Sequence, residues 1–294
     1  DRDFPDPDVL TVEGTYYAFA TNGNGHNIQT ARSTDLVHWD VHADALPRLP
    51  DWAVPDFGWA WAPDVTTFDG QTYLMYFTAR FAMGQGGTQC IGLASSEKPE
   101  GPYTPIGAGP FICQTGEGGS IDAASFVDAD GTPWLLWKND GNSGGGQAWI
   151  YLQQLTPDGQ GLVGEPTRLI TADQRWEGIL VEGPTLWRQD DRYVLFYSAN
   201  DYASPKYAAG IAVADSILGP YEKVGEDPFL GTTIPAGIVG PGGQDVVVGP
   251  DGETWILFHG WSPGAYRRLY LAPLQWSDGL PVLPTLTRGP LPNP

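Results

Sequence analysis

The sequence predicts an all-β fold, a five-bladed β-propeller with four antiparallel strands in each blade, formed by residues 1–294 as one domain. Three observations predict it. A strand–turn–strand pattern occurs five times at nearly equal spacing, an acidic turn joins the two strands of each copy, and no segment shows a convincing helical stripe. Small antiparallel sheets repeated around an axis make a propeller, whereas a β-sandwich gives no reason for five equal periods.

Each of the five copies is predicted to form a β-hairpin. Their turns are Glu13-Gly14, Asp69-Gly70, Asp130-Gly131, Asp190-Asp191 and Asp251-Gly252. Turns of this composition favour the tight connections of antiparallel strands. The aligned first-strand positions are Asp6, Ala62, Asp122, Glu182 and Gly243. They lie roughly 60 residues apart, so five periods fill the chain.

The segments after each hairpin predict the remaining strands. Apolar segments that begin at residues 27, 89, 148, 208 and 267 predict the third strands, and residues 35–39, 101–103 and 219–221 suggest outer fourth strands. Residues 204–217 could be mistaken for a helix. They are predicted to contain a strand because they fall in register with the third strand of the other copies.

The charge balance excludes several classes of partner. Acidic residues outnumber basic residues by 35 to 15, which gives a formal net charge of −20. Nucleic-acid affinity depends on Lys and Arg that neutralise phosphates, so neither nucleic acid nor an anionic membrane surface is expected as a partner. No apolar run approaches the roughly 18 residues of a membrane-spanning helix. The charge is typical of a soluble monomer.

The terminus and the cysteines bear on location. The chain begins at Asp1 without an initiator Met, which fits either a trimmed sequence or a mature secreted form, and we expect a secreted or extracytoplasmic protein, with a cytoplasmic location as the alternative. Cys90 and Cys113 are the two cysteines. A disulfide would suit an exported protein, and two buried thiols are the alternative.

Aromatic and acidic side chains indicate the chemistry. The chain has 12 Trp and 13 Tyr, and indole faces suit the stacking of sugar rings. The first strand of each blade lines the central channel of a propeller, so Asp6, Asp122 and Glu182 are predicted to meet at one end of it. Three carboxylates around one pocket suit inverting glycoside hydrolysis, in which a base activates water and an acid protonates the leaving oxygen.

Four motifs that contain these residues resemble glycoside hydrolase family 43. They are Phe4-Pro5-Asp6-Pro7-Asp8-Val9, Trp61-Ala62-Pro63-Asp64-Val65, Ile121-Asp122-Ala123 and Glu182-Gly183-Pro184. The resemblance covers essentially the whole chain. It implies that Asp6 is the general base, Asp122 the residue that modulates the pKa, and Glu182 the general acid. Asp8 and Asp64 are expected deeper in the channel, outside the chemistry.

The resemblance implies further site residues. Trp61 resembles the aromatic floor beneath the cleaved sugar, with a core tryptophan between blades as the alternative. Arg267 resembles a clamp on sugar hydroxyls, a task suited to the guanidinium fork. His259 matches a histidine that can sit beside a bound calcium ion with waters, although a lone histidine is more often a core residue. Gln244 is expected in the same channel, as a substrate contact.

The function implied is exo-acting hydrolysis that releases L-arabinofuranose from arabinan or arabinoxylan of plant cell walls. The segments WKNDGN, GPGGQD and HGW favour this reading, with β-xylosidase and exo-α-1,5-arabinanase as alternatives within the family. No cofactor is required for the chemistry, although Ca²⁺ in the channel is compatible with it. Motifs of the retaining fructan-active propellers are absent. A non-catalytic sugar-binding propeller is disfavoured, because it need not keep a proton donor facing a base.

Overall fold

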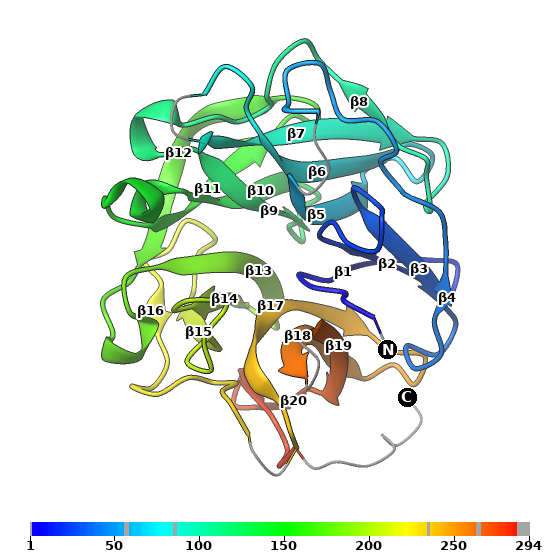
Figure 1. The fold of residues 1–294 in the computed structure, drawn as a ribbon. Coiled ribbons are helices and arrows are strands. Elements are labelled where there is room, and N and C mark those ends of the chain that lie inside the picture. Colours follow the sequence, from blue (N-terminus) through cyan, green and yellow to red (C-terminus); the bar gives the residue numbers. More distant parts are fainter. Residues whose placement is uncertain (1, 56–58, 85–86, 234–235, 263–265, 287–294) are drawn as a thin grey trace.

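Five antiparallel sheets surround a central axis in the computed structural model of the protein, which describes residues 2–55, 59–84, 87–233, 236–262 and 266–286 (Figure 1). The predicted all-β, five-bladed propeller is confirmed. The helical elements among the described residues include the short 3₁₀ turns η2 (Thr115–Glu117), η3 (Gly141–Gly144) and η4 (Arg175–Glu177). None of the helices in the described residues has the length and hydrophobicity to cross a membrane.

Every blade is built from strands that follow one another in the chain. The first blade contains β1 (Asp8–Val12), β2 (Thr15–Ala20), β3 (Gln29–Ser33) and β4 (Asp40–Val41). The second contains β5 (Ala60–Thr67), β6 (Tyr73–Arg80), β7 (Gln89–Ser96) and β8 (Thr104–Ile106). The third contains β9 (Ser120–Val127), β10 (Pro133–Asn139), β11 (Trp149–Leu155) and β12 (Leu162–Thr171).

The last two blades follow the same order. The fourth contains β13 (Val181–Gln189), β14 (Arg192–Ala199), β15 (Ala208–Ala214) and β16 (Glu222–Lys223). The fifth contains β17 (Val239–Val248), β18 (Thr254–Ser262) and β19 (Tyr266–Pro273), and the hairpin of β20 (Gln275–Ser277) and β21 (Leu280–Val282) follows it. The strand β15 lies within residues 204–217, as its register predicts.

Buried apolar side chains form clusters on the faces of the sheets. The second strands are their most buried members, and Phe77, Leu135, Phe196 and Ile256 have no exposed surface. Cys90 of β7 and Cys113 are joined by a disulfide, which ties β7 to the segment before η2. The apolar clusters therefore pack on the faces of the sheets. The ends of the inner strands that face the channel are left for polar groups.

Among the described residues, hydrogen bonds from the N-terminal segment to the fifth blade close the ring. The N–H of Phe4 donates to the Arg267 carbonyl at 2.8 Å, and the N–H of Arg267 donates to Asp3 Oδ1 at 2.7 Å. The N-terminal segment therefore runs beside β19 and joins the first blade to the fifth (Figure 1). Because this segment continues into Asp6, the hydrogen bonds that close the ring also fix the position of the Asp6 carboxylate.

A left-handed residue occurs near the start of the inner strand of every blade. These residues are Asp6, Ala62, Asp122, Gly183 and Gly243, with φ values of 51°, 40°, 56°, 53° and 55°. In the second to fifth blades the strand pairing shifts at this point, as at a β-bulge. Bulges re-aim side chains and are frequent beside active sites. In the fourth blade the position belongs to Gly183, so Glu182 lies one residue before the register predicted for it.

Three aspartates, of which Asp64 is buried and the other two are half-buried, link blades deeper in the channel. Asp8 accepts the Val65 N–H, Asp64 accepts the Ser125 N–H, and Asp245 accepts the Val9 N–H, each at 2.8–2.9 Å. These bonds cross three consecutive junctions between blades. Asp8 and Asp64 thus lie deeper than Asp6, as expected, and their carboxylates are used by the fold.

Burial of these aspartates has a cost in stability that depends on pH. Burial raises the pKa of Asp64 to about 6 and that of Asp245 to about 7, from 3.8. Burial and the other two aspartates raise the pKa of Asp8 as well. Folded-state pKa values above the unfolded values mean that the folded protein binds more protons. Stability from these groups is therefore present at low pH and is lost as the pH rises through about 6 to 7.

We expect Asp64→Asn to stabilise the protein near pH 8 and to reduce the change in melting temperature between about pH 8 and pH 6. The asparagine keeps an oxygen for the Ser125 N–H, and its amide replaces Asp64 Oδ2, which has no partner among the described residues. Thermal unfolding at several pH values measures both effects, with the exposed Asp215→Asn as the control. A lower melting temperature for Asp64→Asn at every pH would contradict this assignment.

Candidate active site

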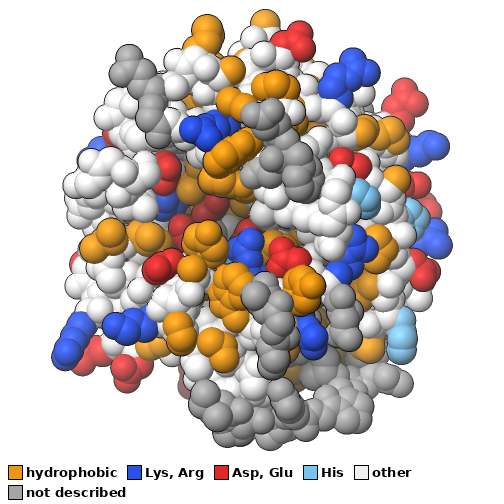
Figure 2. Space-filling view, viewed as in Figure 1, with side chains coloured by type: hydrophobic (Ala, Val, Ile, Leu, Met, Phe, Trp, Pro, Cys, Tyr) orange, Lys and Arg blue, Asp and Glu red, His pale blue; other side chains and the backbone are white. Residues whose placement is uncertain are grey.

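A hollow of about 910 Å³ opens where the inner strands begin, and Asp6, Asp122 and Glu182 all line it. Figure 2 shows this face hollowed near its centre, with acidic side chains inside. The structure therefore brings together three acids that come from the first, third and fourth copies of the sequence repeat. Trp61 and Arg267 line the same hollow.

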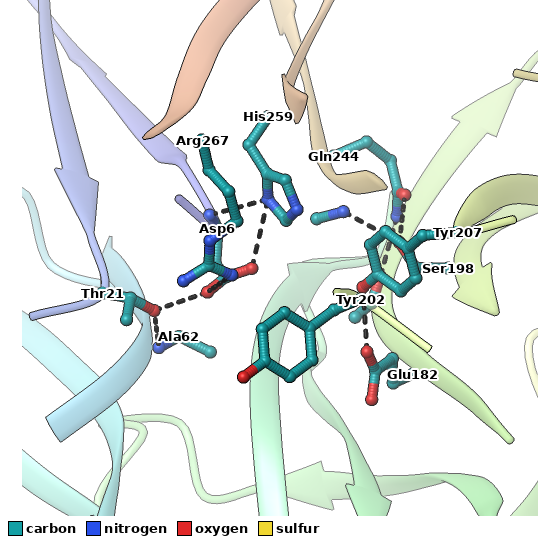
Figure 3. Close-up of polar contacts among 12 residues, drawn as sticks. Asp6, Thr21, Ala62, Glu182, Ser198, Tyr202, Tyr207, Gln244, His259 and Arg267 are labelled. Atoms are coloured by element: carbon teal, nitrogen blue, oxygen red, sulfur yellow. Dashed lines mark hydrogen bonds and ion pairs between the residues drawn. The ribbon is translucent and has the colours of Figure 1, made fainter. Parts of the chain in front are cut away.

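The carboxylate of Asp6 is surrounded by groups that favour its charged form. Its Oδ2 accepts the Thr21 hydroxyl at 2.6 Å and lies 3.6 Å from Arg267 Nη1 (Figure 3). Burial alone would raise the pKa of Asp6, but the Arg267 guanidinium, the His259 ring and the Thr21 hydroxyl hold it well below its usual range. Asp6 is consequently ionised at neutral pH, as a general base must be.

Glu182 occupies a different environment on the other side of the hollow (Figure 3). The Tyr207 hydroxyl donates to Glu182 Oε1 at 2.9 Å, and Lys138 Nζ lies 4.0 Å from Oε2. Burial raises the pKa of Glu182, although the Lys138 ammonium opposes the change. The two carboxyl groups expected to act as acid and base thus have pKa values shifted in opposite directions, as their roles require.

Asp122 stands between these two environments. Its Oδ2 accepts the Gly183 N–H at 3.0 Å, directly beside Glu182 in the chain. Burial and the Glu182 carboxylate raise the pKa of Asp122 to about 8. Because two close carboxylates resist being charged together, Asp122 and Glu182 keep a proton between them near neutral pH. The structure shows the effect of Glu182 on the pKa of Asp122, and the predicted role of Asp122 in modulating the pKa of Glu182 stays a prediction.

Small residues fill the other three bulge positions, which keeps the centre of the hollow open. The need is clearest at Gly243, where an added Cβ would lie 2.7 Å from His259 Nδ1 and 2.8 Å from Asp6 Oδ1. The left-handed backbone there also favours glycine. Any larger residue at this position would push on the base.

Trp61 and Arg267 lie where the sequence predicts contacts with sugar. Trp61 is half-buried in the hollow with Trp59 6.1 Å away, and it stays the predicted floor. Arg267 lies between Asp6 and the ring of Tyr202, whose centroid is 5.2 Å from the guanidinium carbon. The guanidinium therefore has an electrostatic role toward the base in addition to its predicted contact with hydroxyl groups.

Gln244 is predicted to contact the substrate, but it lies outside the hollow. Its side chain is buried, its Oε1 accepts the Ser198 hydroxyl at 2.9 Å, and its Nε2 donates to the Gly183 carbonyl at 2.7 Å. Both ends of the amide are thus occupied by the protein. Gln244 connects the fourth and fifth blades and holds the backbone beside Glu182, and it lines the deeper channel instead of the hollow.

His259 is buried and neutral, because burial lowers its pKa. Its Nδ1 lies 3.1 Å from the Asp6 nitrogen, from which it accepts the N–H, and 3.2 Å from Asp6 Oδ1, while its buried Nε2 has no partner among the described residues. No group of three metal-binding side chains occurs among the described residues. These donors do not fit direct ligation of Ca²⁺ by His259. An ion held through water stays a prediction.

Sequence reasoning missed several polar partners of the acids, Thr21, Lys138 and Tyr207 among them. Lys138 lies inside the WKNDGN segment and Thr21 closes the first hairpin, so alignment of the second strands of the five copies could have found both. Tyr207 comes from the loop before β15, where the repeat gives no register. Its ring stacks on His259 at 5.7 Å, which no periodicity predicts.

Comparisons with known proteins agree with this geometry. A family model described as glycosyl hydrolases family 43 matches residues 1–281. The chain is 27% identical over 293 residues to an extracellular endo-α-(1→5)-L-arabinanase 1 of Bacillus subtilis strain 168. The alignment covers 94% of this chain and 86% of that protein.

Two further likenesses come from a xylosidase and a solved structure. A β-xylosidase of the same organism is 28% identical over 265 residues, covering 87% of this chain and 47% of the relative, so the chain spans about half of that protein. The crystal structure of a thermostable family-43 glycoside hydrolase matches with a TM-score of 0.88 at 33% identity and covers 100% of this chain and 96% of that one.

Proposed function

The chain belongs to glycosyl hydrolase family 43, and from this premise we propose that it is an inverting, exo-acting α-L-arabinofuranosidase. Its substrate would be terminal L-arabinofuranose on arabinan or arabinoxylan. The observation that carries the proposal is the facing pair of carboxyl groups in one hollow, Asp6 ionised and Glu182 with a raised pKa. The enzyme class, a glycoside hydrolase, follows from the family itself.

The proposed reaction uses the two sides of the hollow separately. Asp6 takes a proton from a water molecule as that oxygen attacks the anomeric carbon. Glu182 gives its proton to the glycosidic oxygen, and the bond from that oxygen to the anomeric carbon breaks. The attacking oxygen arrives opposite the leaving group, so the configuration is inverted. Arg267 keeps Asp6 charged before attack, and Asp122 keeps the proton available on the pair.

The walls of the hollow support exo action. The Tyr202 ring lies over Arg267, and the Tyr202 carbonyl accepts the Trp261 indole N–H at 2.7 Å. These contacts connect the loop after β14, which contributes Tyr202 to the lining of the hollow, to the fifth blade. We propose that this connection bounds one side of the site, and a bounded site accepts a chain end more readily than the middle of a polymer.

Several features of the proposal concern the setting of the enzyme. A carbohydrate substrate of the arabinan or xylan type is supported by the arabinanase and xylosidase names of the relatives. Two relatives carry the word extracellular in their names, which supports secretion of this chain as well. A monomer is the proposed state in solution, since the high negative charge opposes self-association.

We expect Glu182→Gln to lower kcat on natural arabinosides by about 10²–10⁴-fold, because an amide cannot donate the proton. Aryl arabinosides with acidic leaving groups should lose much less, because they depart without protonation. Rates across a series of leaving groups measure this difference, and the exposed Glu226→Gln serves as the control. Equal losses on every substrate would exclude Glu182 as the acid.

We expect Asp6→Gly to lower the rate strongly on every substrate, because water needs its base whatever the leaving group. Glycine accepts the left-handed φ of this position, so the change removes the carboxylate without backbone strain. Added azide should restore turnover and give a glycosyl azide of inverted configuration, identified by NMR. An azide product of retained configuration would overturn the inverting assignment.

We expect kcat/KM for an aryl α-L-arabinofuranoside to exceed that for the aryl β-D-xylopyranoside by about tenfold or more, the scale of one discriminating contact. The products from debranched arabinan and oligosaccharides show whether single sugars are released from an end. A preference for xylopyranoside would favour β-xylosidase, and internal cleavage would favour the endo action named for the arabinanase relative. Binding without turnover would favour a sugar-binding propeller.

A further inference from the structure

One of the five blade junctions breaks the pattern of the other four. In four junctions, the N–H of the left-handed bulge residue donates to a side chain on or just after the second strand of the preceding blade. Ala62 donates to Thr21, Asp122 to Thr78, Gly243 to Ser198 and Asp6 to His259, at 2.8–3.2 Å. Each acceptor holds the inner strand of the next blade in place.

The equivalent position between the third and fourth blades is Lys138. It pairs with Ile121 in the sheet, as Thr78 pairs with Trp61 and Ser198 with Glu182. An ammonium group has three donors and no acceptor, so Lys138 cannot receive the N–H of Gly183. That N–H donates to Asp122 Oδ2 at 3.0 Å instead. The exception occurs at the junction that holds Asp122 and Glu182, which are called the acid pair below.

The Lys138 side chain is only 1% exposed, and its surroundings are acidic. Its Nζ lies 3.1 Å from Asp140 Oδ1 and 4.0 Å from Glu182 Oε2. A buried ammonium is costly unless it is paired, and removal of one partner of a buried ion pair is destabilising because the other charge is left unpaired. A threonine here would complete the hydrogen-bond pattern of the other junctions but would remove the cation beside Asp140 and Glu182. This junction therefore has a buried cation where the other junctions have a neutral acceptor.

We propose that Lys138 is a positioning residue for the acid pair, with two effects. Its ammonium stabilises the single negative charge shared by Asp122 and Glu182, and its inability to accept a hydrogen bond leaves the Gly183 N–H to orient Asp122. When Glu182 gives its proton to the glycosidic oxygen, a second carboxylate forms in a buried site. Lys138, anchored on Asp140, is the cation beside it.

Other charged and titratable groups also face Glu182 and remain in place when Lys138 is changed. They are Asp122 on β9, Asp140 after β10, Tyr207 before β15 and Asp6 before β1. Three of these groups are acidic, and the tyrosine is neutral. Removal of the ammonium leaves them uncompensated, which favours protonation of the pair and hinders proton release.

The test is a pair of substitutions, Lys138→Thr and Lys138→Arg. Threonine supplies the acceptor found at the other junctions and removes the charge, whereas arginine keeps the charge. We expect Lys138→Thr to fold with a lowered melting temperature. It should shift the alkaline limb of the kcat profile upward by about one pH unit and lose roughly tenfold more activity on natural than on activated aryl substrates. Lys138→Arg, which keeps the positive charge, should have the pH profile of the unaltered protein.

A second readout does not depend on the sugar. The Glu182 carboxyl can be followed by ¹³C NMR in protein labelled at glutamate, its signal identified by its loss in Glu182→Gln. The inference rests on Glu182 as the proposed acid, and a pKa of Glu182 that does not rise in Lys138→Thr overturns it whatever the substrate. A raised pKa in an enzyme that cleaves no arabinofuranoside would refute the proposed substrate alone. Equal activity losses on all substrates in Lys138→Thr, with an unchanged pH profile, would also overturn the proposed role of Lys138.

Discussion

The hydrogen bond from each left-handed bulge residue to the neighbouring blade is the interaction on which the architecture of the site depends. Bonds between blades fix the inner strands of a propeller relative to one another. The backbone N–H at the bulge provides them, and it reaches across because the bulge turns the strand out of its regular pleat. In the first and third blades the bulge residue is also one of the acids that line the hollow, Asp6 or Asp122. Structure and chemistry therefore use one backbone position.

The contrast between Asp6 and Glu182 follows from what surrounds each junction. At the junction of the fifth and first blades the acceptor is a neutral histidine, and Arg267 on β19 supplies a positive charge beside the carboxylate. At the junction of the third and fourth blades two acids share one lysine. Equal burial would raise both pKa values, so the difference comes from which charged partner each blade contributes.

The acids buried in this channel position strands and reacting groups, and their burial lowers the stability of the fold. Asp8, Asp64 and Asp245 use their carboxylates to join blades, each by accepting a backbone N–H from a neighbouring blade. Their elevated pKa values show that the folded chain holds these groups against their tendency to ionise. The large cores between the blades supply the stability that offsets this cost.

The sequence by itself determined the repeat, and with it the five blades, the hairpin turns and the positions of Asp6, Asp122 and Glu182 near one end of the channel, because strand periodicity and turn chemistry are local properties. The one-residue offset of Glu182, the engagement of both ends of the Gln244 amide and the pairing of Lys138 with the acids were decided only by the tertiary structure. Bulges alter register without a sequence signal of their own, and the partner of a buried polar group depends on which blade lies beside it. The opposite pKa shifts of base and acid likewise arise from charges far away in the chain, which come together only when the ring closes.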